Sequence, residues 1–210
     1  MTKIAVVFHS ATGNVHALAH ALAEGAGQEG AEVRIRRAPE TAPPEAIASN
    51  ERWQRYVDEV APTVPEVHLD DLEWADGLAF GSPTRFGGPT AQLKSVLDQT
   101  GGLWFRGALV DKVATGFTSA STHHGGLEST ILALNNVFYH WGAIVLPVGY
   151  SAPIFHEHGN PYGASWVSRK SAPPDDTALE AARQQGRRLA DVTAALVRGR
   201  AAQAQAPSST

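Results

Sequence analysis

The sequence predicts an α/β fold in which five parallel strands form a doubly wound sheet with helices on both faces. Two observations predict it: strand and helix signals alternate along the chain, and residues 4–8 form an uninterrupted apolar run. Such a run is typical of a strand that is buried on both faces of a parallel sheet. Because parallel strands must be joined by crossover connections, which are usually helical, the alternation and the buried strand indicate the same fold class.

Four further strands follow in order. Residues 32–36 alternate apolar and charged side chains, as expected nearer a sheet edge, whereas residues 76–80, 113–117 and 143–146 are mostly apolar. Between the strands, apolar residues recur at helical spacing and predict the crossover helices. The clearest stripe consists of Leu127, Ile131, Leu134, Phe138 and Trp141.

A single domain over residues 1–200 accounts for this pattern. Residues 38–70 hold five prolines around an amphipathic piece, residues 53–60, and predict an insertion with a short helix. Residues 150–174 are rich in Gly, Pro and His and predict a second insertion, a loop. The tail at 201–210 is polar and alanine-rich, and we expect it to be frayed.

The composition excludes several function classes. A net charge of −4 does not favour binding to nucleic acid or to an anionic membrane surface, and we expect neither partner. The chain has no cysteine, which excludes disulfides, iron–sulfur clusters and thiol catalysis and predicts a cytoplasmic protein. No apolar run is long enough to span a bilayer. Any redox chemistry must therefore come from a bound cofactor.

Three loops follow predicted strand ends, at residues 9–14, 82–88 and 118–126. In a doubly wound sheet the ligand binds beyond the carboxyl ends of the strands. We therefore expect these loops to form the site.

The first loop has the composition of an anion site. It reads His9-Ser10-Ala11-Thr12-Gly13-Asn14 and leads directly into a helix, so backbone N–H groups and the helix dipole favour negative charge there. It lacks the patterns of dinucleotide and triphosphate loops, which makes a monophosphate the better fit. The alternative is an ordinary N-capped turn, since Ser, Thr and Asn favour caps in any case.

The second and third loops suit a flat polar ligand. Residues 81–89 carry glycines that allow close backbone approach, together with Arg85 and Phe86, although a plain turn with an exposed arginine would look the same. Residues 118–126 are small and polar and offer backbone donors. The pairs His123-His124 and His156-Glu157-His158 read more simply as polar loops than as ligand sets, and no metal site is predicted.

Four motifs then make a resemblance specific. They are Pro83-Thr84-Arg85-Phe86-Gly87, Asp98-Gln99-Thr100-Gly101-Gly102-Leu103-Trp104, Gly125-Gly126 with Glu128, and Asn160-Pro161-Tyr162-Gly163-Ala164. In this order they resemble the tryptophan-repressor-binding-protein (WrbA) family, flavodoxin-like NAD(P)H:quinone oxidoreductases of type IV. The resemblance covers roughly residues 3 to 198.

The resemblance implies FMN as the cofactor, with NADH or NADPH as the electron donor. It implies that the phosphate is held by Ser10, Ala11, Thr12, Gly13, Asn14 and Val15. It implies that the isoalloxazine is bordered by Pro83, Thr84, Arg85, Phe86 and Gly87. Its pyrimidine side would be held by Ser119, Ala120, Ser121, Thr122, His123, His124 and Gly125.

The substrate side of the site is also implied by the resemblance. Trp104 would face the nicotinamide or the quinone, and Thr12 stands where the family often has an aromatic that contacts the nucleotide. His140 would lie near the ring, either as a proton donor to the quinone or as a hydrogen-bond partner of the cofactor. In this family, neighbouring subunits of a homotetramer complete the site.

The sequence therefore predicts an enzyme that reduces quinones by two electrons in a ping-pong reaction. Two alternatives stay open at this point. One is a flavodoxin-type electron carrier without quinone reductase activity. The other is an FMN-containing protein-binding module.

Overall fold

The computed structural model describes residues 1–169 and 172–205. Its sheet has the strand order β2-β1-β3-β4-β5, and all of these pairs are parallel. The strands are β1 (Lys3–Phe8), β2 (Glu32–Arg37), β3 (Gly77–Pro83), β4 (Val113–Ala120) and β5 (Ile144–Val145). The predicted doubly wound α/β fold is confirmed, and the order reverses at β1, which lies between β2 and β3.

The fifth position of the sheet is shared by two short strands. β5 pairs only with Val113 and Ala114, at the start of β4, whereas β6 (Ser165–Val167) pairs with the end of β4 from Thr118 onward. β6 and α8 (Pro153–His158) lie in the segment that the sequence predicts as a loop. This pairing brings Ser168 to the end of β4, where its hydroxyl donates to the Ala120 carbonyl at 3.2 Å.

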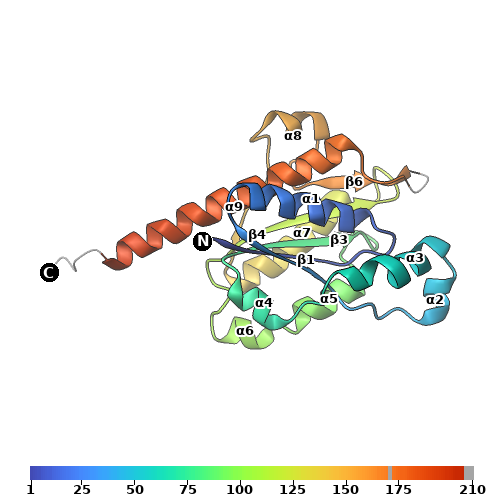
Figure 1. The fold of residues 1–210 in the computed structure, drawn as a ribbon, viewed down its shortest axis with the longest axis horizontal. Coiled ribbons are helices and arrows are strands. Elements are labelled where there is room, and N and C mark those ends of the chain that lie inside the picture. Colours follow the sequence, from blue (N-terminus) through green and yellow to red (C-terminus); the bar gives the residue numbers. More distant parts are fainter. Residues whose placement is uncertain (170–171, 206–210) are drawn as a thin grey trace.

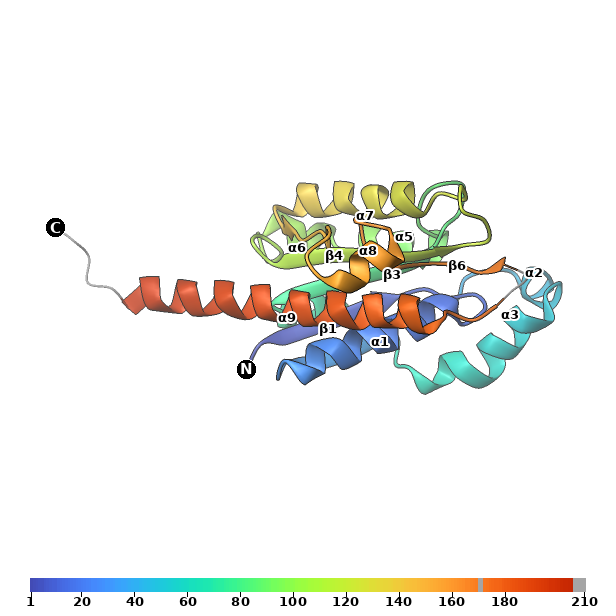
Figure 2. The ribbon, with the colours of Figure 1, turned by 90° about the horizontal axis from the view of Figure 1, so that it is seen from above.

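Helices cover both faces of the sheet (Figures 1 and 2). One face carries α1 (Asn14–Gln28), α8 and α9 (Asp176–Gln205), and the other carries α4 (Leu69–Trp74), α5 (Ala91–Asp98), α6 (Gly101–Phe105) and α7 (Leu127–Trp141). α9 continues five residues into the segment predicted to be frayed, and residues 206–210 lie outside the described part of the chain.

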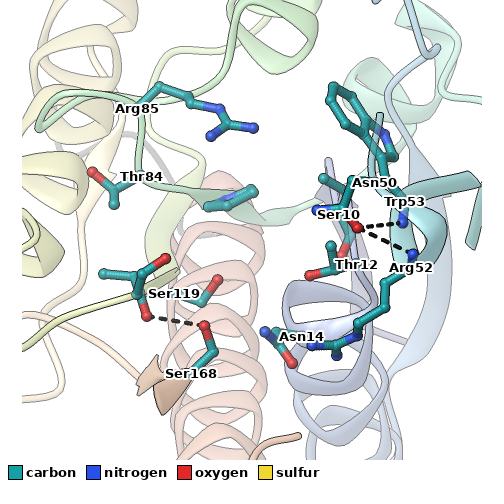
Figure 3. A pocket seen from close by; sticks show the side chains of 14 residues that line it. Ser10, Thr12, Asn14, Asn50, Arg52, Trp53, Thr84, Arg85, Ser119 and Ser168 are labelled. Carbon is teal, nitrogen blue, oxygen red and sulfur yellow. Dashed lines mark hydrogen bonds between the residues drawn. The ribbon is translucent and has the colours of Figure 1, made fainter. Parts of the chain in front are cut away.

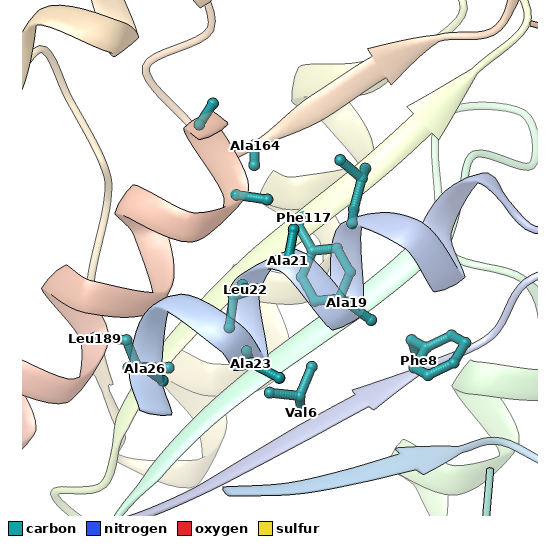
Figure 4. Close-up of a cluster of buried hydrophobic side chains, with 14 of the residues drawn as sticks. Val6, Phe8, Ala19, Ala21, Leu22, Ala23, Ala26, Phe117, Ala164 and Leu189 are labelled. Atoms are coloured by element: carbon teal, nitrogen blue, oxygen red, sulfur yellow. The ribbon is translucent and has the colours of Figure 1, made fainter. Parts of the chain in front are cut away.

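The first of these layers is held by close packing of α1 against α9. A Cβ at Gly25 would lie 1.9 Å from the Arg183 carbonyl oxygen, and one at Gly186 would lie 1.9 Å from the Leu22 carbonyl oxygen. Only glycine permits backbones to approach this closely. Beside this crossing, the small side chains of α1 pack with Phe8 and Phe117 of the sheet (Figure 4). The start of α1, which carries the predicted anion loop, is thereby fixed to the core.

The insertion between β2 and β3 is helical. It contains α2 (Pro44–Ala48), α3 (Glu51–Arg55), a π-helical turn (Tyr56–Val60), a 3₁₀ turn (Ala61–Thr63) and then α4. Prolines at 43 and 44 start α2 and Asn50 caps α3, which explains the break between them. In Figure 1, α2 and α3 lie at the end of the sheet toward which the strands run.

The two ends of the sheet can now be named. The carboxyl edge is where β1, β3 and β4 end, at Phe8, Pro83 and Ala120, and the amino edge is where they begin. Among the described helices, none is both long enough and apolar enough to cross a bilayer.

Candidate functional site

A cavity of about 350 Å³ lies at the carboxyl edge (Figure 3). Segments far apart in the sequence form it: the loop after β1, the insertion, the loop after β3, the loop after β4 and the residue after β6. Its lining residues are Ser10, Ala11, Thr12, Asn14, Asn50, Arg52, Trp53, Pro83, Thr84, Arg85, Ser119, Ala120, Ser121 and Ser168. All three predicted loops therefore meet at one cavity.

The first loop presents the N-terminal end of α1 to the cavity. Gly13 caps the helix in a left-handed conformation with φ 94°, a backbone that glycine adopts without strain. The Ser10 hydroxyl accepts a hydrogen bond from the Gly13 N–H at 3.1 Å, which closes the loop. The first-turn N–H groups of a helix lack intrahelical partners, so this geometry favours an anion.

The second loop is a tight turn that Thr84 holds in place. Its hydroxyl accepts from the Gly87 N–H at 3.2 Å and from the Thr130 hydroxyl at 2.9 Å, while Arg85 and Gly88 exchange backbone hydrogen bonds. Phe86 at the tip has φ 51° and is fully exposed in the single chain. Pro83, Thr84 and Arg85 line the cavity, whereas Phe86 and Gly87 do not.

The third loop contributes its first half to the cavity. Ser119, Ala120 and Ser121 line it. His123 and His124 instead line a second cavity of about 720 Å³ against α8 and the segment around β6. Thr122 and Gly125 are brought into neither cavity.

The insertion supplies one wall of the cavity, which sequence reasoning did not find. Asn50, Arg52 and Trp53 line it. The Asn50 side chain accepts from the Arg52 N–H at 3.1 Å and from the Trp53 N–H at 3.2 Å, as an N-cap of α3. Asn50, directly before a helix whose first turn carries the acidic Glu51, is the sequence signal that could have located the start of α3.

A half-buried carboxylate, Glu40, ties this wall to the first loop and to α5. Glu40 accepts from the Trp53 indole at 3.0 Å, from His9 at 3.1 Å and from Gln92 at 2.5 Å. Burial acts to raise the pKa of Glu40, but the hydrogen bonds from His9, the Ala42 N–H and Gln92 outweigh it and lower the pKa to about 2. Glu40 is therefore ionised at neutral pH and fixes three elements around one point.

The charge of the cavity is positive. Among its fourteen lining residues, Arg52 and Arg85 are charged and there is no Asp or Glu. They come from opposite sides of the opening (Figure 3). Within the described residues, neither guanidinium forms an ion pair. In a chain of net charge −4, this local excess favours an anionic ligand.

Trp104 and His140 lie away from the cavity, at the amino edge. Trp104 is on α6. Arg106, just after α6, forms an ion pair with Glu73 of α4, and α4 ends shortly before β3 begins, so α6 lies near the start of β3. His140 is in the last turn of α7, about 20 Å along that helix from its start at the cavity side. Both side chains are exposed in the single chain. A role for either in the cavity therefore requires another copy of the chain.

Of the predicted first-loop residues, some line the cavity and others do not. Ser10, Ala11, Thr12 and Asn14 line the cavity, Gly13 shapes the loop, and Val15 is buried in the core behind it. Across residues 1–169 and 172–205, no three His, Cys, Asp or Glu side chains are grouped so as to hold a metal.

The cavity residues fit a flavin mononucleotide. The start of α1 offers unpaired N–H groups and hydroxyls for a phosphate, the walls carry cations rather than carboxylates, and the volume falls in the range of small-molecule sites. The fold thus defines a flavodoxin-like protein, and its carboxyl-edge cavity has residues suited to such a cofactor.

Sequence comparison identifies the family. Residues 2–157 match the family described as NADPH-dependent FMN reductase. A relative from Deinococcus radiodurans named NAD(P)H dehydrogenase (quinone) is 42% identical over 196 residues, which covers 93% of this chain and 97% of the relative. One from Aromatoleum aromaticum with the same name is 40% identical over 208 residues, covering 95% and 100%. The chain belongs to this family of flavodoxin-like oxidoreductases.

Solved structures agree with the fold. A flavodoxin, WrbA-like protein from Agrobacterium tumefaciens superposes with a TM-score of 0.65 at 25% identity, covering 93% of this chain and 99% of that one. An archaeal flavodoxin superposes with a TM-score of 0.61, covering 92% and 99%, and at 19% identity it supports the fold alone. The resemblance predicted from the four sequence motifs is confirmed.

Proposed function

We propose that this protein is an FMN-dependent NAD(P)H:quinone oxidoreductase that reduces quinones to hydroquinones by two electrons. The observation that carries the proposal is a positively charged, hydroxyl-lined cavity at the carboxyl edge of a flavodoxin-like sheet. Relatives that match over nearly the whole chain are named NAD(P)H dehydrogenase (quinone), and the family model is named for FMN reduction with NADPH.

The chain's own residues bind and orient the cofactor. The loop with Ser10, Thr12 and Asn14 would hold the phosphate, Ser119 and the loop after it would face the polar edge of the ring, and Pro83 to Arg85 would border it. FMN, when bound, supplies the transfer of a hydride from NAD(P)H and of two electrons to a quinone. The protein contributes position, positive charge and exclusion of water.

We place donor and acceptor in one slot over the cofactor. If one flat partner at a time stacks on the cofactor, NAD(P)H has to leave before the quinone enters. This order demands ping-pong kinetics, and an initial-rate matrix of NADH against benzoquinone should give parallel double-reciprocal lines. Intersecting lines would contradict the shared slot.

The aromatic wall of that slot would come from a neighbouring subunit. Trp104, Phe105, Val110 and Tyr139 are exposed at the amino edge, and we call them the amino-edge patch. The Asp111 N–H donates to the Gly142 carbonyl at 2.9 Å, which places the α6 side beside the end of α7. We propose a homotetramer in which this patch packs against another copy and brings Trp104 and His140 to its cavity. His140 would then donate a proton or hold the cofactor.

The central experiment is the absorbance spectrum of the purified protein, followed by anaerobic NADH and then benzoquinone. A flavin spectrum that bleaches with NADH, with turnover on benzoquinone, is the expected result. Bound flavin without turnover on either nucleotide would indicate an electron carrier, and the absence of flavin would overturn the assignment.

We further propose a cytoplasmic location, where NAD(P)H is available, with no nucleic-acid or membrane partner.

A further inference from the structure

The insertion presents one arginine to the cavity on a rigid support. Arg52 is in the first turn of α3, where the Asn50 cap holds its N–H at 3.1 Å. The next residue, Trp53, is anchored through its indole to Glu40. Glu40 is in turn bound by His9, which immediately precedes the first loop. The backbone of Arg52 is therefore fixed relative to the start of α1.

The Arg52 side chain has no partner of its own among the described residues. It is half-buried and lines the cavity, yet it forms no ion pair and donates no side-chain hydrogen bond within that part of the chain. In Figure 3 it extends toward the start of α1, where Asn14 lies. The Glu40 carboxylate is already occupied by donors from His9, Trp53 and Gln92.

Other cations near this end of α1 do not substitute for it. Burial lowers the pKa of His16 to about 4, with repulsion from His20 adding to the effect, so His16 is neutral at physiological pH. Arg85 approaches from the opposite side of the opening, on the loop after β3 (Figure 3). The first-loop residues that line the cavity, Ser10, Ala11, Thr12 and Asn14, carry no charge, so Arg52 would supply the positive charge beside a phosphate bound there.

We propose that Arg52 is a phosphate-binding residue that the insertion adds to the cofactor site. Its ligand is the 5′-phosphate of FMN, and the inference rests on the proposed function. A guanidinium donates to phosphate oxygens in a bidentate manner and is always charged. Because it is half-buried and unpaired beside a helix N-terminus, its interaction with a dianion is screened less than at an open surface.

The test compares flavins that differ only in the phosphate. Full-length protein freed of flavin by dialysis is titrated with FMN and with riboflavin, followed by flavin fluorescence, for wild type, Arg52→Gln, Arg52→Lys and Arg55→Gln. Arg55 is on the same helix, is exposed and does not line the cavity, so it is the matched control. Circular dichroism checks that each variant is folded.

We expect Arg52→Gln to weaken FMN binding by about tenfold to a hundredfold, the range for a lost hydrogen bond to a charged group. Riboflavin affinity should change by less than about twofold. Arg52→Lys should fall between wild type and Arg52→Gln, and Arg55→Gln should match wild type. Inorganic phosphate should compete with FMN in wild type more strongly than in Arg52→Gln.

Two results would overturn the inference while leaving the proposed function intact. One is FMN affinity that is unchanged in Arg52→Gln. The other is an equal loss for FMN and riboflavin, which would place Arg52 at the ring instead of the phosphate. Wild-type protein that binds neither flavin would instead overturn the proposed function together with the inference.

Discussion

The two edges of the sheet carry opposite kinds of surface. The carboxyl edge collects hydroxyls and two arginines around a cavity, with Trp53 as the aromatic in its lining. Neither arginine forms an ion pair within the described residues. The amino edge exposes the patch of Trp104, Phe105, Val110 and Tyr139. One chain therefore carries a cofactor-type cavity at one edge and an exposed apolar patch at the other, while Phe86 is a separate exposed aromatic at the tip of the second loop.

We expect the two edges to play separate roles, one in cofactor binding and the other in turnover. Binding of the FMN phosphate should depend on the carboxyl edge, because the lining residues all belong to one chain. Turnover should depend on both edges if a neighbouring copy supplies the stacking wall. Substitutions at the two edges should then have separable effects on FMN affinity and on rate.

The largest effect is expected from Ser10→Asp in the first loop. The new carboxylate would compete for the N–H groups at the start of α1 and would repel the phosphate. Two like charges about 4 Å apart repel by about 4 kcal/mol at an effective dielectric constant of about 20. FMN affinity, measured by fluorescence titration, should fall by about a hundredfold or more.

Ser10→Ala is the matched control for that variant. It removes the hydroxyl that accepts from the Gly13 N–H without adding a charge. FMN affinity should fall by about tenfold or less, the value of a single hydrogen bond. If Ser10→Asp bound FMN as tightly as wild type, the phosphate would not lie at this loop.

At the amino edge, Phe105→Glu tests whether the patch is buried by another copy. A carboxylate in an apolar interface is costly to desolvate, so the assembly should dissociate. Sedimentation velocity should show a smaller species, and quinone reductase activity should fall by at least about tenfold while each chain still binds FMN. Phe105→Leu keeps an apolar side chain and should remain assembled. Wild-type protein that sediments as a 22.3 kDa monomer would refute the tetramer.

Trp104→Ala should lower turnover without dissociating the cofactor. Loss of the indole would loosen the stacking of nicotinamide and quinone, and small misplacements of reacting groups reduce rate by about tenfold or more. Trp104→Phe should retain most activity, because it keeps an aromatic face. The measurements are kcat and KM for NADH and benzoquinone beside FMN affinity. Loss of FMN from Trp104→Ala would place this residue in the cofactor site itself.

The sequence predicted the carboxyl edge better than the rest of the site. Continuous apolar runs such as residues 4–8 mark buried strands, and the residues that follow each strand end must meet, so the three loops could be placed without coordinates. Asn50 and Arg52 could not be placed this way, because their position depends on Glu40 binding Trp53 across thirteen residues.

Short elements and contacts between copies explain the other features that the sequence did not predict. β6 has three residues, too few for a periodicity signal, and it is a strand because it pairs with the end of β4. α8 and α6 are similarly short. The resemblance implied that Trp104 and His140 belong to the site. The βαβ topology places both at the amino edge, because a crossover helix runs antiparallel to its strands and ends where the next strand begins, so only another copy could bring them to the cavity.

The smallest effect is expected at Glu40, which supports the carboxyl edge from behind the cavity. Its pKa is about 2 in the folded protein, against an ordinary value of 4.5, so its ionised form contributes stability above about pH 4.5 that is lost as the pH falls toward 2. Glu40→Gln keeps the size but weakens the hydrogen bonds from His9 and Trp53, and should lower the free energy of unfolding by about 1–2 kcal/mol at pH 7. Urea unfolding at pH 7, 4 and 3 should show this difference shrinking with acid.

The matched control is Glu45→Gln, exposed on α2, which should change the free energy of unfolding by less than about 0.5 kcal/mol. Because Trp53 would be held less firmly, FMN affinity in Glu40→Gln should also fall a few-fold, less than in Arg52→Gln. A difference in stability that is the same at all three pH values would mean that the Glu40 charge is not what holds the insertion against the first loop.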